Sequence, residues 1–306
     1  MKEVRVFAPA TVSNVGPGFD LMGFAIDQPG DILRIRTNDL GKIRIINKCD
    51  ISLPEDPEHN VAGVALLSLL GKMESNAGYD IIFEEKINPG SGIGSSAASS
   101  TAAVVGLNEL LGNPLSKIDL IPHALDGEFV ASKSLHADNI APAMLGGIVL
   151  IRSYDPFDLI ELKAPENLWC TLVHPEIEIK TAESRKLIPK KINLKDALAQ
   201  SGNLACLIAG LTTSNYSLIA RSLDDRIAEP VRKNGIPGYS ILKDKLKEEG
   251  ILGMNISGSG PSLFALSDSY ETAKKAEAVM KEEFKSLNIG CKTYLSRISE
   301  KGTRII

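Results

Sequence analysis

Short apolar stretches alternate along the chain with longer segments of helical periodicity. The short stretches predict strands at residues 4–8, 32–35, 42–46, 79–84, 146–151, 168–174, 253–256 and 263–266. The longer segments predict helices at residues 61–73, 94–111, 193–212, 214–223 and 272–287. In the last helix the residues that recur at helical spacing are Ala273, Ala276, Met280, Phe284 and Leu287. Strands interleaved with helices are typical of a mixed α/β or α+β architecture.

A polar stretch marked by prolines, residues 153–165, follows the predicted buried strand at 146–151. Segments of this composition commonly separate domains, so we expect two domains, residues 1–160 and 161–306. The 306 residues are enough for two hydrophobic cores. Hydrophobic residues make up 43% and charged residues 24% of the chain, which is the balance of an ordinary globular protein.

Charge and cysteine content argue against several classes of protein. The net charge is −4 and the pI is about 5.7, whereas a nucleic-acid-binding protein usually carries a basic domain or stripe. The longest apolar runs fall short of the roughly 20 residues of a membrane span, and no signal peptide is visible. The four cysteines lie far apart, which favours reduced thiols over a disulfide framework or a zinc site. We therefore expect a soluble, cytoplasmic protein without nucleic-acid or membrane partners.

The sharpest chemical signal is a glycine-rich loop between a predicted strand and a helix of small residues. It reads Pro89-Gly90-Ser91-Gly92-Ile93-Gly94-Ser95-Ser96-Ala97-Ala98. Glycines let a backbone adopt positive φ and let a ligand approach closely, and the N–H groups and dipole of the following helix attract anions. The spacing matches neither the Walker A loop nor the dinucleotide-binding fingerprint. Taken alone, the segment indicates either an anion site or a flexible loop whose serine caps the helix.

Two further clusters of glycine, proline and small polar residues occur at residues 8–20 and 256–262. The first contains Asn14 and Asp20, polar groups that could converge on an amine or hydroxyl of a substrate. The second, Ile256-Ser257-Gly258-Ser259-Gly260-Pro261-Ser262, lies between two predicted strands. Taken alone, it is more simply a turn between those strands.

Together and in this order, the three clusters resemble those of the GHMP kinase superfamily. Three more segments, residues 134–142, 174–185 and 227–239, are similar to those of its members that phosphorylate L-homoserine, and the resemblance spans nearly the whole chain. It implies an α+β, two-domain GHMP kinase fold. The N-terminal domain would be ribosomal protein S5 domain 2-like and the C-terminal domain ferredoxin-like, with the site in the cleft between them. It also implies a homodimer.

The activity implied by this resemblance is ATP-dependent phosphorylation of the L-homoserine hydroxyl in threonine biosynthesis, with ATP and Mg²⁺ as cofactors. The implied nucleotide-binding residues are Asn60, Pro89, Gly90, Ser91, Gly92, Ile93, Gly94, Ser95, Ser96, Ala97, Ala98 and Ser99. Ser96 and Glu128 would hold the metal and, with Asn139, form the catalytic set. The implied substrate-binding residues are Asn14, Asp20, His136, Asp138, Thr181, Arg185 and Arg232.

Several of these residues also have a plainer interpretation. Asn60 can simply cap the following helix, Glu128 can be an ordinary exposed carboxylate on a helix, and a lone histidine such as His136 is more often a packed structural residue. The arginines suit their implied role, because a guanidinium makes bidentate, charge-assisted bonds to a carboxylate.

The sequence departs from relatives in the glycine loop, and its Asn139 bears on the mechanism that the resemblance implies. The glycine loop is one residue shorter than in many homoserine-phosphorylating relatives, and Ile93 stands where leucine is usual. Asn139 stands near the position where several superfamily members carry an aspartate base. An amide cannot usefully accept the proton, so we expect a reaction without a dedicated protein base.

Two other functions remain open from the sequence. The chain could be a GHMP kinase for mevalonate, shikimate or a sugar, although the paired arginines and the segment at 136–139 favour an amino-acid substrate. It could also be a non-catalytic nucleotide-binding sensor. The presence of Ser95, Ser96 and Glu128 favours an enzyme over a sensor.

Overall fold

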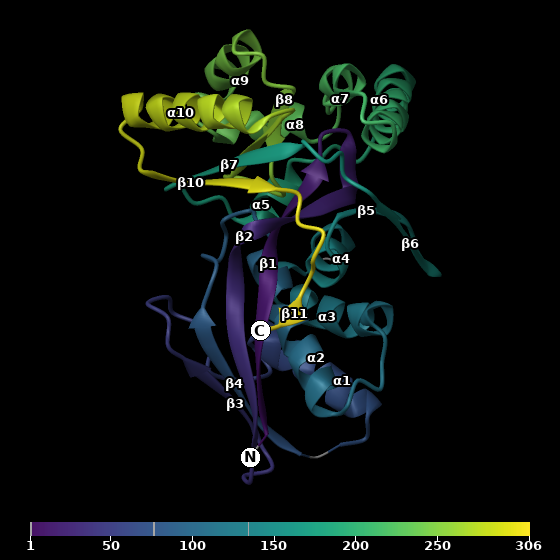
Figure 1. Cartoon of the computed structure of the whole chain (residues 1–306), viewed down its shortest axis with the longest axis vertical. Helices are drawn as coiled ribbons and strands as arrows, with labels where there is room; N and C mark the ends of the chain where they lie inside the picture. Colours follow the sequence, from purple (N-terminus) through teal and green to yellow (C-terminus); the bar gives the residue numbers. More distant parts are fainter. Residues whose placement is uncertain (1, 76, 134) are drawn as a thin grey trace.

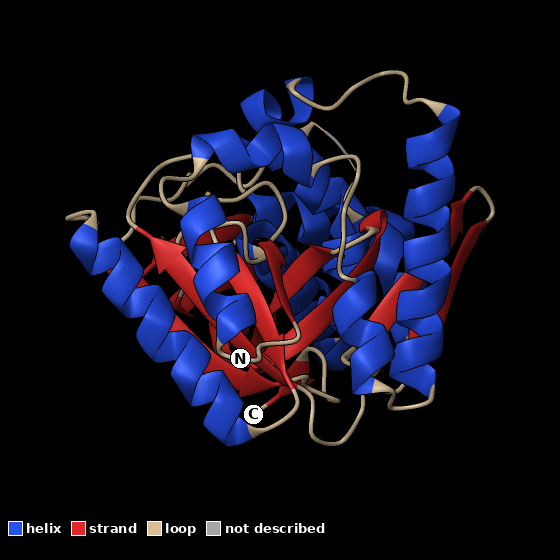
Figure 2. Ribbon diagram, turned by 90° about the horizontal axis from the view of Figure 1, so that it is seen from above, coloured by secondary structure: helices blue, strands red, loops and turns tan. Residues whose placement is uncertain are grey.

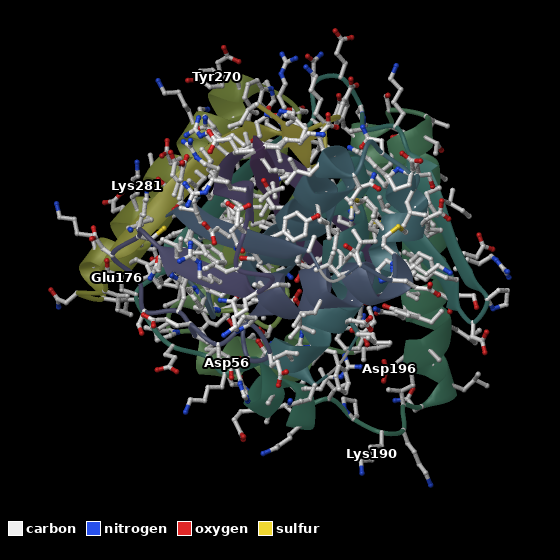
Figure 3. All side chains as sticks on the ribbon, turned by 90° about the horizontal axis from the view of Figure 1, so that it is seen from below. Asp56, Glu176, Lys190, Asp196, Tyr270 and Lys281 are labelled. Atoms are coloured by element: carbon white, nitrogen blue, oxygen red, sulfur yellow. The ribbon has the colours of Figure 1, made fainter. Side chains whose placement is uncertain are left out.

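The computed structural model describes residues 2–75, 77–133 and 135–306, so Ser134, the first residue of the segment at 134–142, lies outside the described residues. Two β-sheets with helices packed on them follow one another along the long axis of the molecule (Figure 1). Of the charged side chains labelled in Figure 3, Asp56, Glu176, Lys190 and Lys281 are exposed and point outward. Among the described helices, none is long and apolar enough to cross a membrane.

The first sheet has seven strands and is built around two long ones. Its members are β1 (Glu3–Val15), β2 (Gly18–Asn38), β3 (Ile43–Asn47), β4 (Gly78–Glu85), β5 (Ile148–Tyr154), β6 (Phe157–Leu162) and β11 (Arg304–Ile305). The strand order is β11-β1-β2-β4-β3, and β5 pairs with both β2 and β6. The pairs are antiparallel except for β3 with β4. The predicted domain boundary after residue 160 falls inside β6 and stays a prediction.

The strands predicted at 4–8 and 32–35 are only parts of β1 and β2. Pro29 and Gly30 interrupt the apolar alternation of β2, and both residue types are usually strand breakers. The pairing with β1 instead shifts register here, from Pro9 opposite Gly30 to Thr11 opposite Ala25. The early part of β2 thereby approaches the second sheet while it stays paired with β1 and β5 of the first.

Four helices cover one face of the first sheet: α1 (Val61–Lys72), α2 (Ser95–Leu110), α3 (Lys117–Ser132) and α4 (Ala137–Leu145). The small residues of α2 let its backbone approach the strands closely. A Cβ on Gly106 would lie 2.6 Å from a side-chain atom of Ile35. The predicted helices at 61–73 and 94–111 are confirmed, whereas α3 and α4, each with an internal proline, were not apparent from the pattern.

The second sheet is antiparallel in the order β10-β7-β9-β8. Its strands are β7 (Trp169–Pro175), β8 (Gly253–Ile256), β9 (Leu263–Ser267) and β10 (Cys291–Arg297). The helices of this half are α5 (Thr181–Lys186), α6 (Leu194–Thr212), α7 (Tyr216–Ser222), α8 (Glu229–Arg232), α9 (Tyr239–Glu248) and α10 (Tyr270–Ser286), with a 3₁₀ turn at Lys233–Gly235. Strands and helices thus follow the β-α-β-β-α-β sequence of a ferredoxin-like unit. The apolar stripe of α10, with Ala276, Met280 and Phe284 buried, confirms the helix predicted at 272–287.

One of the two hydrophobic cores extends across both halves, and the other lies within the C-terminal half. Phe24 of β2 meets Phe264 of β9 edge to face, with ring centroids 5.9 Å apart. The early part of β2 reaches the C-terminal half (Figure 1). Seen from above, helices lie around the strands (Figure 2). At the carboxyl end, β11 returns to pair with β1. The relative position of the two halves is therefore fixed by packing and by strand pairing.

Two glycine segments lock together at the junction of the halves. In the glycine loop (residues 89–98), the carbonyl of Ser91 accepts from the Ser262 hydroxyl at 2.6 Å, and that of Gly92 accepts from the Ser257 hydroxyl at 2.7 Å. Both hydroxyls belong to the glycine turn (residues 257–262), which connects β8 to β9. A Cβ on Gly92 would lie only 2.6 Å from the Gly260 carbonyl oxygen. The glycine turn is thus a strand-to-strand turn and also a brace for the glycine loop.

This packing predicts different consequences for two glycines of similar conformation. Gly90 and Gly92 have φ of +74° and +77°, but a Cβ on Gly90 would meet nothing within 4 Å. Both alanine variants should lose about 1–2 kcal/mol to the left-handed conformation. Gly92→Ala should lose about 1–3 kcal/mol more because its methyl group overpacks the junction. Urea unfolding of both variants measures the difference, and equal losses would contradict the close packing of Gly92.

Candidate active site

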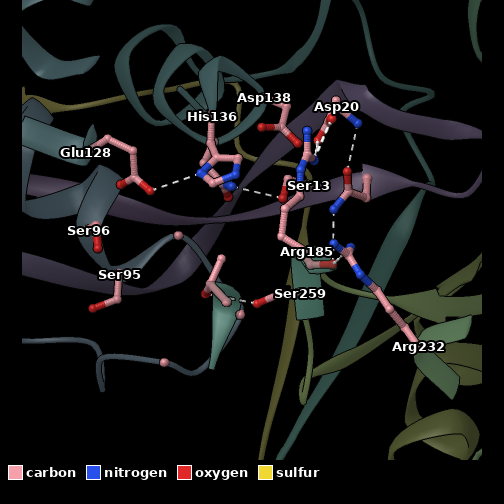
Figure 4. A pocket seen from close by; sticks show the side chains of 17 residues that line it. Ser13, Asp20, Ser95, Ser96, Glu128, His136, Asp138, Arg185, Arg232 and Ser259 are labelled. Atoms are coloured by element: carbon pink, nitrogen blue, oxygen red, sulfur yellow. Dashed lines mark hydrogen bonds and ion pairs between the residues drawn. The ribbon is translucent and has the colours of Figure 1, made fainter. Parts of the chain in front are cut away.

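A polar pocket opens where the glycine loop, the early part of β2 and the C-terminal helices meet (Figure 4). All seven predicted substrate-binding residues line it, as do Glu128, Asn139 and Ser96 of the predicted catalytic set. Of the other predicted nucleotide-binding residues, the pocket is lined by Gly90, Gly92, Gly94 and Ser95. Ser13, Gly258 and Ser259 complete the lining. The structure therefore brings together residues that lie up to 246 positions apart, from Ser13 to Ser259.

One end of the pocket is the N-terminus of α2. Gly94 precedes the helix with φ +71°, a left-handed conformation, and no side chain caps the helix. A Cβ on Gly94 would lie 2.0 Å from the Thr11 hydroxyl, so only glycine fits there. Uncapped N–H groups and the positive end of the helix dipole make this end suited to an anion, even though the loop is one residue short.

The two serines at the start of α2 face different ways. The Ser95 hydroxyl donates to the Ile87 carbonyl at 2.8 Å and accepts from the Lys86 ammonium, so it is turned toward β4 and the segment after it. The Ser96 hydroxyl makes no hydrogen bond within the described parts of the chain and lies on the pocket side near Glu128 (Figure 4). Ser96 is therefore better placed than Ser95 to meet a ligand.

Behind the loop lies a buried ion pair. The ammonium of Lys86 is 3.2 Å from the carboxylate of Asp31, which also accepts a 2.6 Å hydrogen bond from the Ser99 hydroxyl. Burial raises the pKa of Asp31, and the Lys86 charge opposes that rise. Lys86 further donates to the Ser95 carbonyl at 2.9 Å. The pair thus supports the first turn of α2 from below.

The remaining predicted nucleotide-binding residues do not line the pocket; they are Asn60, Pro89, Ser91, Ile93, Ala97, Ala98 and Ser99. Asn60 caps α1, with its side-chain oxygen accepting from Ala62 N at 3.0 Å. The Ile93 carbonyl accepts from Thr11 N at 3.1 Å, which ties the loop to β1. These residues shape the loop and its supports, and their contact with nucleotide stays a prediction.

Glu128 and His136 lie beside Ser96 at the same end. Nδ1 of His136 is 3.3 Å from Oε1 of Glu128, and both side chains are largely buried. Burial disfavours the charged imidazole, yet the hydrogen bond to Glu128 and the nearby Asp138 raise the pKa of His136 overall. Glu128 is therefore not the exposed helix carboxylate of the plainer interpretation, and His136 is more than a packing residue.

The opposite end of the pocket carries two arginines. Arg185 of α5 makes an ion pair with Asp20 at 2.6 Å. Arg232 of α8 is only 6% exposed and donates to the Gly258 carbonyl at 2.8 Å. No carboxylate among the described residues lies within ion-pair distance of Arg232, and its Nε is buried without a hydrogen-bond acceptor. A buried guanidinium with unused donors is a ready partner for an incoming anion.

Asp138 lies in the wall between the two ends. It is 1% exposed, and its Oδ1 has no hydrogen-bond donor within the described residues. Burial raises the pKa of Asp138, His136 opposes that rise, and the charges of Asp20 and Glu128 add to it, so that the pKa lies at about 6. A carboxylate in this state gains from a cation that enters the pocket.

Asn139 is held from both sides of its amide. Its Oδ1 accepts from the Thr11 hydroxyl at 2.8 Å, and its Nδ2 donates to the Ser13 hydroxyl at 2.9 Å. Both partners belong to β1, where residues two apart face the same side. The amide is thus fixed in place and has no group that could take up a proton.

Sequence reasoning missed Thr11, Ser13, Asp31, Lys86 and Ser259. Thr11 and Ser13 could have been predicted from the sequence, because polar residues two positions apart in an otherwise apolar strand lie on one face of it. No sequence pattern predicts the pairing of Asp31 with Lys86, because it depends on the register of β2 with β4. Ser259 accompanies Thr181, with their hydroxyls 3.2 Å apart across the pocket rim.

Comparison with known proteins identifies the class of protein to which this site belongs. The GHMP kinases N terminal domain model matches residues 60–147, and the GHMP kinases C terminal model matches residues 194–286. The mevalonate kinase of L. major, solved in complex with R-mevalonate, has the same fold with a TM-score of 0.72 at 15% identity, over 97% of this chain and 96% of its own. The two-domain, α+β GHMP kinase fold expected from the sequence is confirmed. Membership of this class also confirms the expectation that the protein is a kinase that uses ATP.

Closer relatives define the family within that class. The homoserine kinase of Chlorobium phaeobacteroides is 45% identical over 320 residues, covering both proteins completely. That of Xanthomonas campestris is 36% identical over 100% of this chain and 95% of its own. The crystal structure of homoserine kinase from Cytophaga hutchinsonii superposes with a TM-score of 0.96 at 46% identity, over 100% of this chain and 98% of its own. The chain belongs to the homoserine kinase family.

The raised pKa of Asp138 predicts that this carboxylate costs stability when ionised. The protonated form contributes stability that is complete below about pH 4 and is lost as the pH rises through 6. Asp138→Asn should therefore stabilise the free protein at pH 7.5, by up to about 3 kcal/mol, and change little at pH 4. Denaturant unfolding at the two pH values measures this.

Asp80 provides a matched control of opposite sign. It is also fully buried, but the hydrogen bond from Arg44 lowers the pKa of Asp80 to about 2 against the cost of burial. Asp80→Asn should destabilise the protein at pH 7.5. If Asp138→Asn were also destabilising at that pH, the assignment of Asp138 as a strained charge would be wrong.

Proposed function

We propose that this chain transfers the γ-phosphoryl group of ATP to the hydroxyl of L-homoserine and forms O-phospho-L-homoserine and ADP. The observation that carries the proposal is the buried guanidinium of Arg232, which has no carboxylate partner within the described residues and lies in one pocket with the buried carboxylate of Asp138. Homoserine is a zwitterion, so its carboxylate and its ammonium complement these two groups. The family of the chain supports the same substrate.

Each end of the pocket then has one task. Arg185 and Arg232 bind the substrate carboxylate, while Asp138 and Asp20 receive the ammonium. Asn14, His136 and Thr181 complete the wall around the substrate. The N-terminus of α2 and the glycine loop bind the ATP phosphates, which places the hydroxyl of the substrate between the two ends (Figure 4). Holding both reactants in one geometry can supply much of the rate enhancement.

Ser96 and Glu128 fit a Mg²⁺ ion. A hydroxyl and a carboxylate are the hard oxygen ligands that Mg²⁺ prefers, and both lie on the phosphate side of the pocket. When bound, the metal supplies charge that offsets the phosphate oxygens. His136 bonds to Glu128 and fixes the direction of that carboxylate.

The proton of the substrate hydroxyl has no dedicated protein acceptor in this proposal. Asn139 is bonded to Thr11 and Ser13 and acts by holding the wall of the pocket in place. Phosphoryl transfer passes through a loose transition state, so positioning and charge stabilisation can carry the reaction. The homodimer and the cytoplasmic location expected from the sequence stay predictions.

A coupled ADP-release assay with ATP and Mg²⁺ tests the substrate. L-homoserine should be turned over far faster than mevalonate, shikimate or galactose, because these lack the ammonium that Asp138 receives. L-threonine serves as an amino acid with a differently placed hydroxyl. Turnover of a sugar or of mevalonate with none of homoserine would overturn the proposal. Nucleotide binding without turnover of any of them would instead indicate a sensor.

Arg232→Lys tests the carboxylate site. The lysine keeps the positive charge but loses the bidentate geometry, so the KM for homoserine should rise by about 10–100-fold. The KM for ATP should change by less than about threefold. Arg226→Lys, which alters an exposed arginine paired with Asp224, is the matched control. Equal effects of Arg232→Lys on both KM values would mean that this residue does not contact the carboxylate.

Asn139→Ala tests the absence of a base. The variant should lower kcat by about 10–100-fold through loss of positioning, whereas removal of a true base typically costs about 10²–10⁴-fold. Steady-state kinetics on correctly folded protein, checked by circular dichroism, measures the loss. Complete inactivation of a folded variant would overturn the proposed role.

A further inference from the structure

Both arginines of the pocket rest against one aromatic ring. The guanidinium carbon of Arg185 is 5.2 Å from the centroid of the Phe19 ring, and that of Arg232 is 5.3 Å from it. Phe19 belongs to β2, whereas the arginines come from α5 and α8 of the other half. Phe19 does not itself line the pocket. Its ring therefore contacts the two groups proposed to bind substrate from outside the lining of the pocket.

The two arginines need such a support because their charges repel. Arg232 is buried, which lowers its pKa; Asp20 opposes that lowering and Arg185 adds to it. Arg185 is 43% exposed at its side chain and extends from a helix of only six residues. A long side chain in that position loses considerable rotamer entropy when it is fixed. Besides Asp20, which pairs with Arg185, and the Gly258 carbonyl, which accepts from Arg232, a rigid group in contact with both side chains would limit this freedom.

An aromatic ring provides this partner. Its π-face carries negative electrostatic potential and attracts a guanidinium within about 6 Å of the centroid, a contact worth about 0.5–1 kcal/mol at exposed sites and more when desolvated. An aliphatic side chain at the same place would offer packing but no attraction for cations. The ring of Phe19 can thus bring two like charges near each other before an anion arrives.

The backbone around Phe19 is itself fixed. The next residue, Asp20, has φ +58°, and its N–H donates to Oδ1 of Asn14 at 2.8 Å. The preceding residue, Gly18, lies so close to Met22 that a Cβ there would be 2.5 Å from the Met22 Cβ. Asp20 in turn pairs with Arg185. The ring is therefore held on both sides along the chain.

We propose that Phe19 is a positioning residue that holds Arg185 and Arg232 in one geometry and so gives the site its preference for a substrate with a carboxylate. This inference rests on the proposed function, in which these arginines bind the carboxylate. It assigns to an apolar residue outside the pocket a part of the specificity of the site.

Two variants of Phe19 separate its aromatic character from its bulk. Phe19→Leu keeps an apolar side chain and removes the π-face, whereas Phe19→Tyr keeps the ring. Phe19→Leu should raise the KM for L-homoserine by about 5–30-fold, the combined loss of two cation–π contacts. Its KM for ATP and its kcat should stay within about threefold of the parent enzyme. Phe19→Tyr should restore the KM for homoserine to within about threefold.

A substrate analogue isolates the carboxylate. 3-Amino-1-propanol keeps the hydroxyl and the amine of homoserine but has no carboxylate. Its kcat/KM, or its inhibition constant against homoserine turnover, should be the same for the parent enzyme and Phe19→Leu. An equal loss for the analogue and for homoserine would show that the ring acts only as a wall of the fold, and would overturn the inference.

The possible failures can be told apart. If the parent enzyme does not turn over homoserine, the proposed function itself is wrong. If the parent enzyme is active and Phe19→Leu has an unchanged KM for homoserine, only the role of Phe19 is wrong. A loss in Phe19→Leu that Phe19→Tyr does not restore, accompanied by a lower Tm, would indicate a structural role and also overturn the inference.

Discussion

The contact between the glycine loop and the glycine turn is the constraint on which the site depends. Gly92 fits against the Gly260 carbonyl only because it lacks a Cβ, and two serine hydroxyls of the turn bind carbonyl oxygens of the loop. The same turn binds the Arg232 guanidinium through Gly258 and the α5 helix through Ser184 and Ser259. One short segment therefore connects the N-terminus of α2 at one end of the pocket with the two arginines at the other end.

This constraint explains how the site can contain buried charged groups that lower the stability of the folded protein. Arg232 and Asp138 are both buried, and each has a polar atom without a hydrogen-bond partner among the described residues. Buried groups of this kind cost stability, and they persist when the surrounding packing leaves them no other conformation. In the proposed function, a zwitterionic substrate would pair with both at once. The unpaired charges raise the free energy of the empty pocket, and a ligand that pairs with them would remove this cost on binding.

The sequence predicted well those elements whose periodicity is regular. The helices α1, α2, α6 and α10 follow from the apolar pattern, whereas α3 and α4 were hidden by internal prolines and most of β2 by Pro29 and Gly30. Proline and glycine inside these elements predict that the helix or strand ends there, but packing against the rest of the protein keeps each element continuous.

In the site, too, the residues that the sequence predicted are those that lie in short sequence motifs. Resemblance to a family gathered all seven substrate-binding candidates, and the structure places each of them on the pocket. What it could not provide are the supports: the Asp31–Lys86 pair, the Thr11 and Ser13 bonds to Asn139, and the ring of Phe19. These depend on strand register and on the docking of the two halves, which no local spacing in the sequence encodes.

The supports matter because the proposed reaction leaves little chemistry to any single side chain. With Asn139 engaged on both sides of its amide, no group at that position can accept a proton, and rate enhancement must come from fixed geometry and fixed charge. Fixed geometry requires that groups which contact the substrate are themselves held by groups that do not. In the proposed site, the ion pair below α2 would hold the phosphate end and Phe19 the arginine end, while β1 holds Asn139. The residues outside the pocket are then as much a part of its function as those that line it.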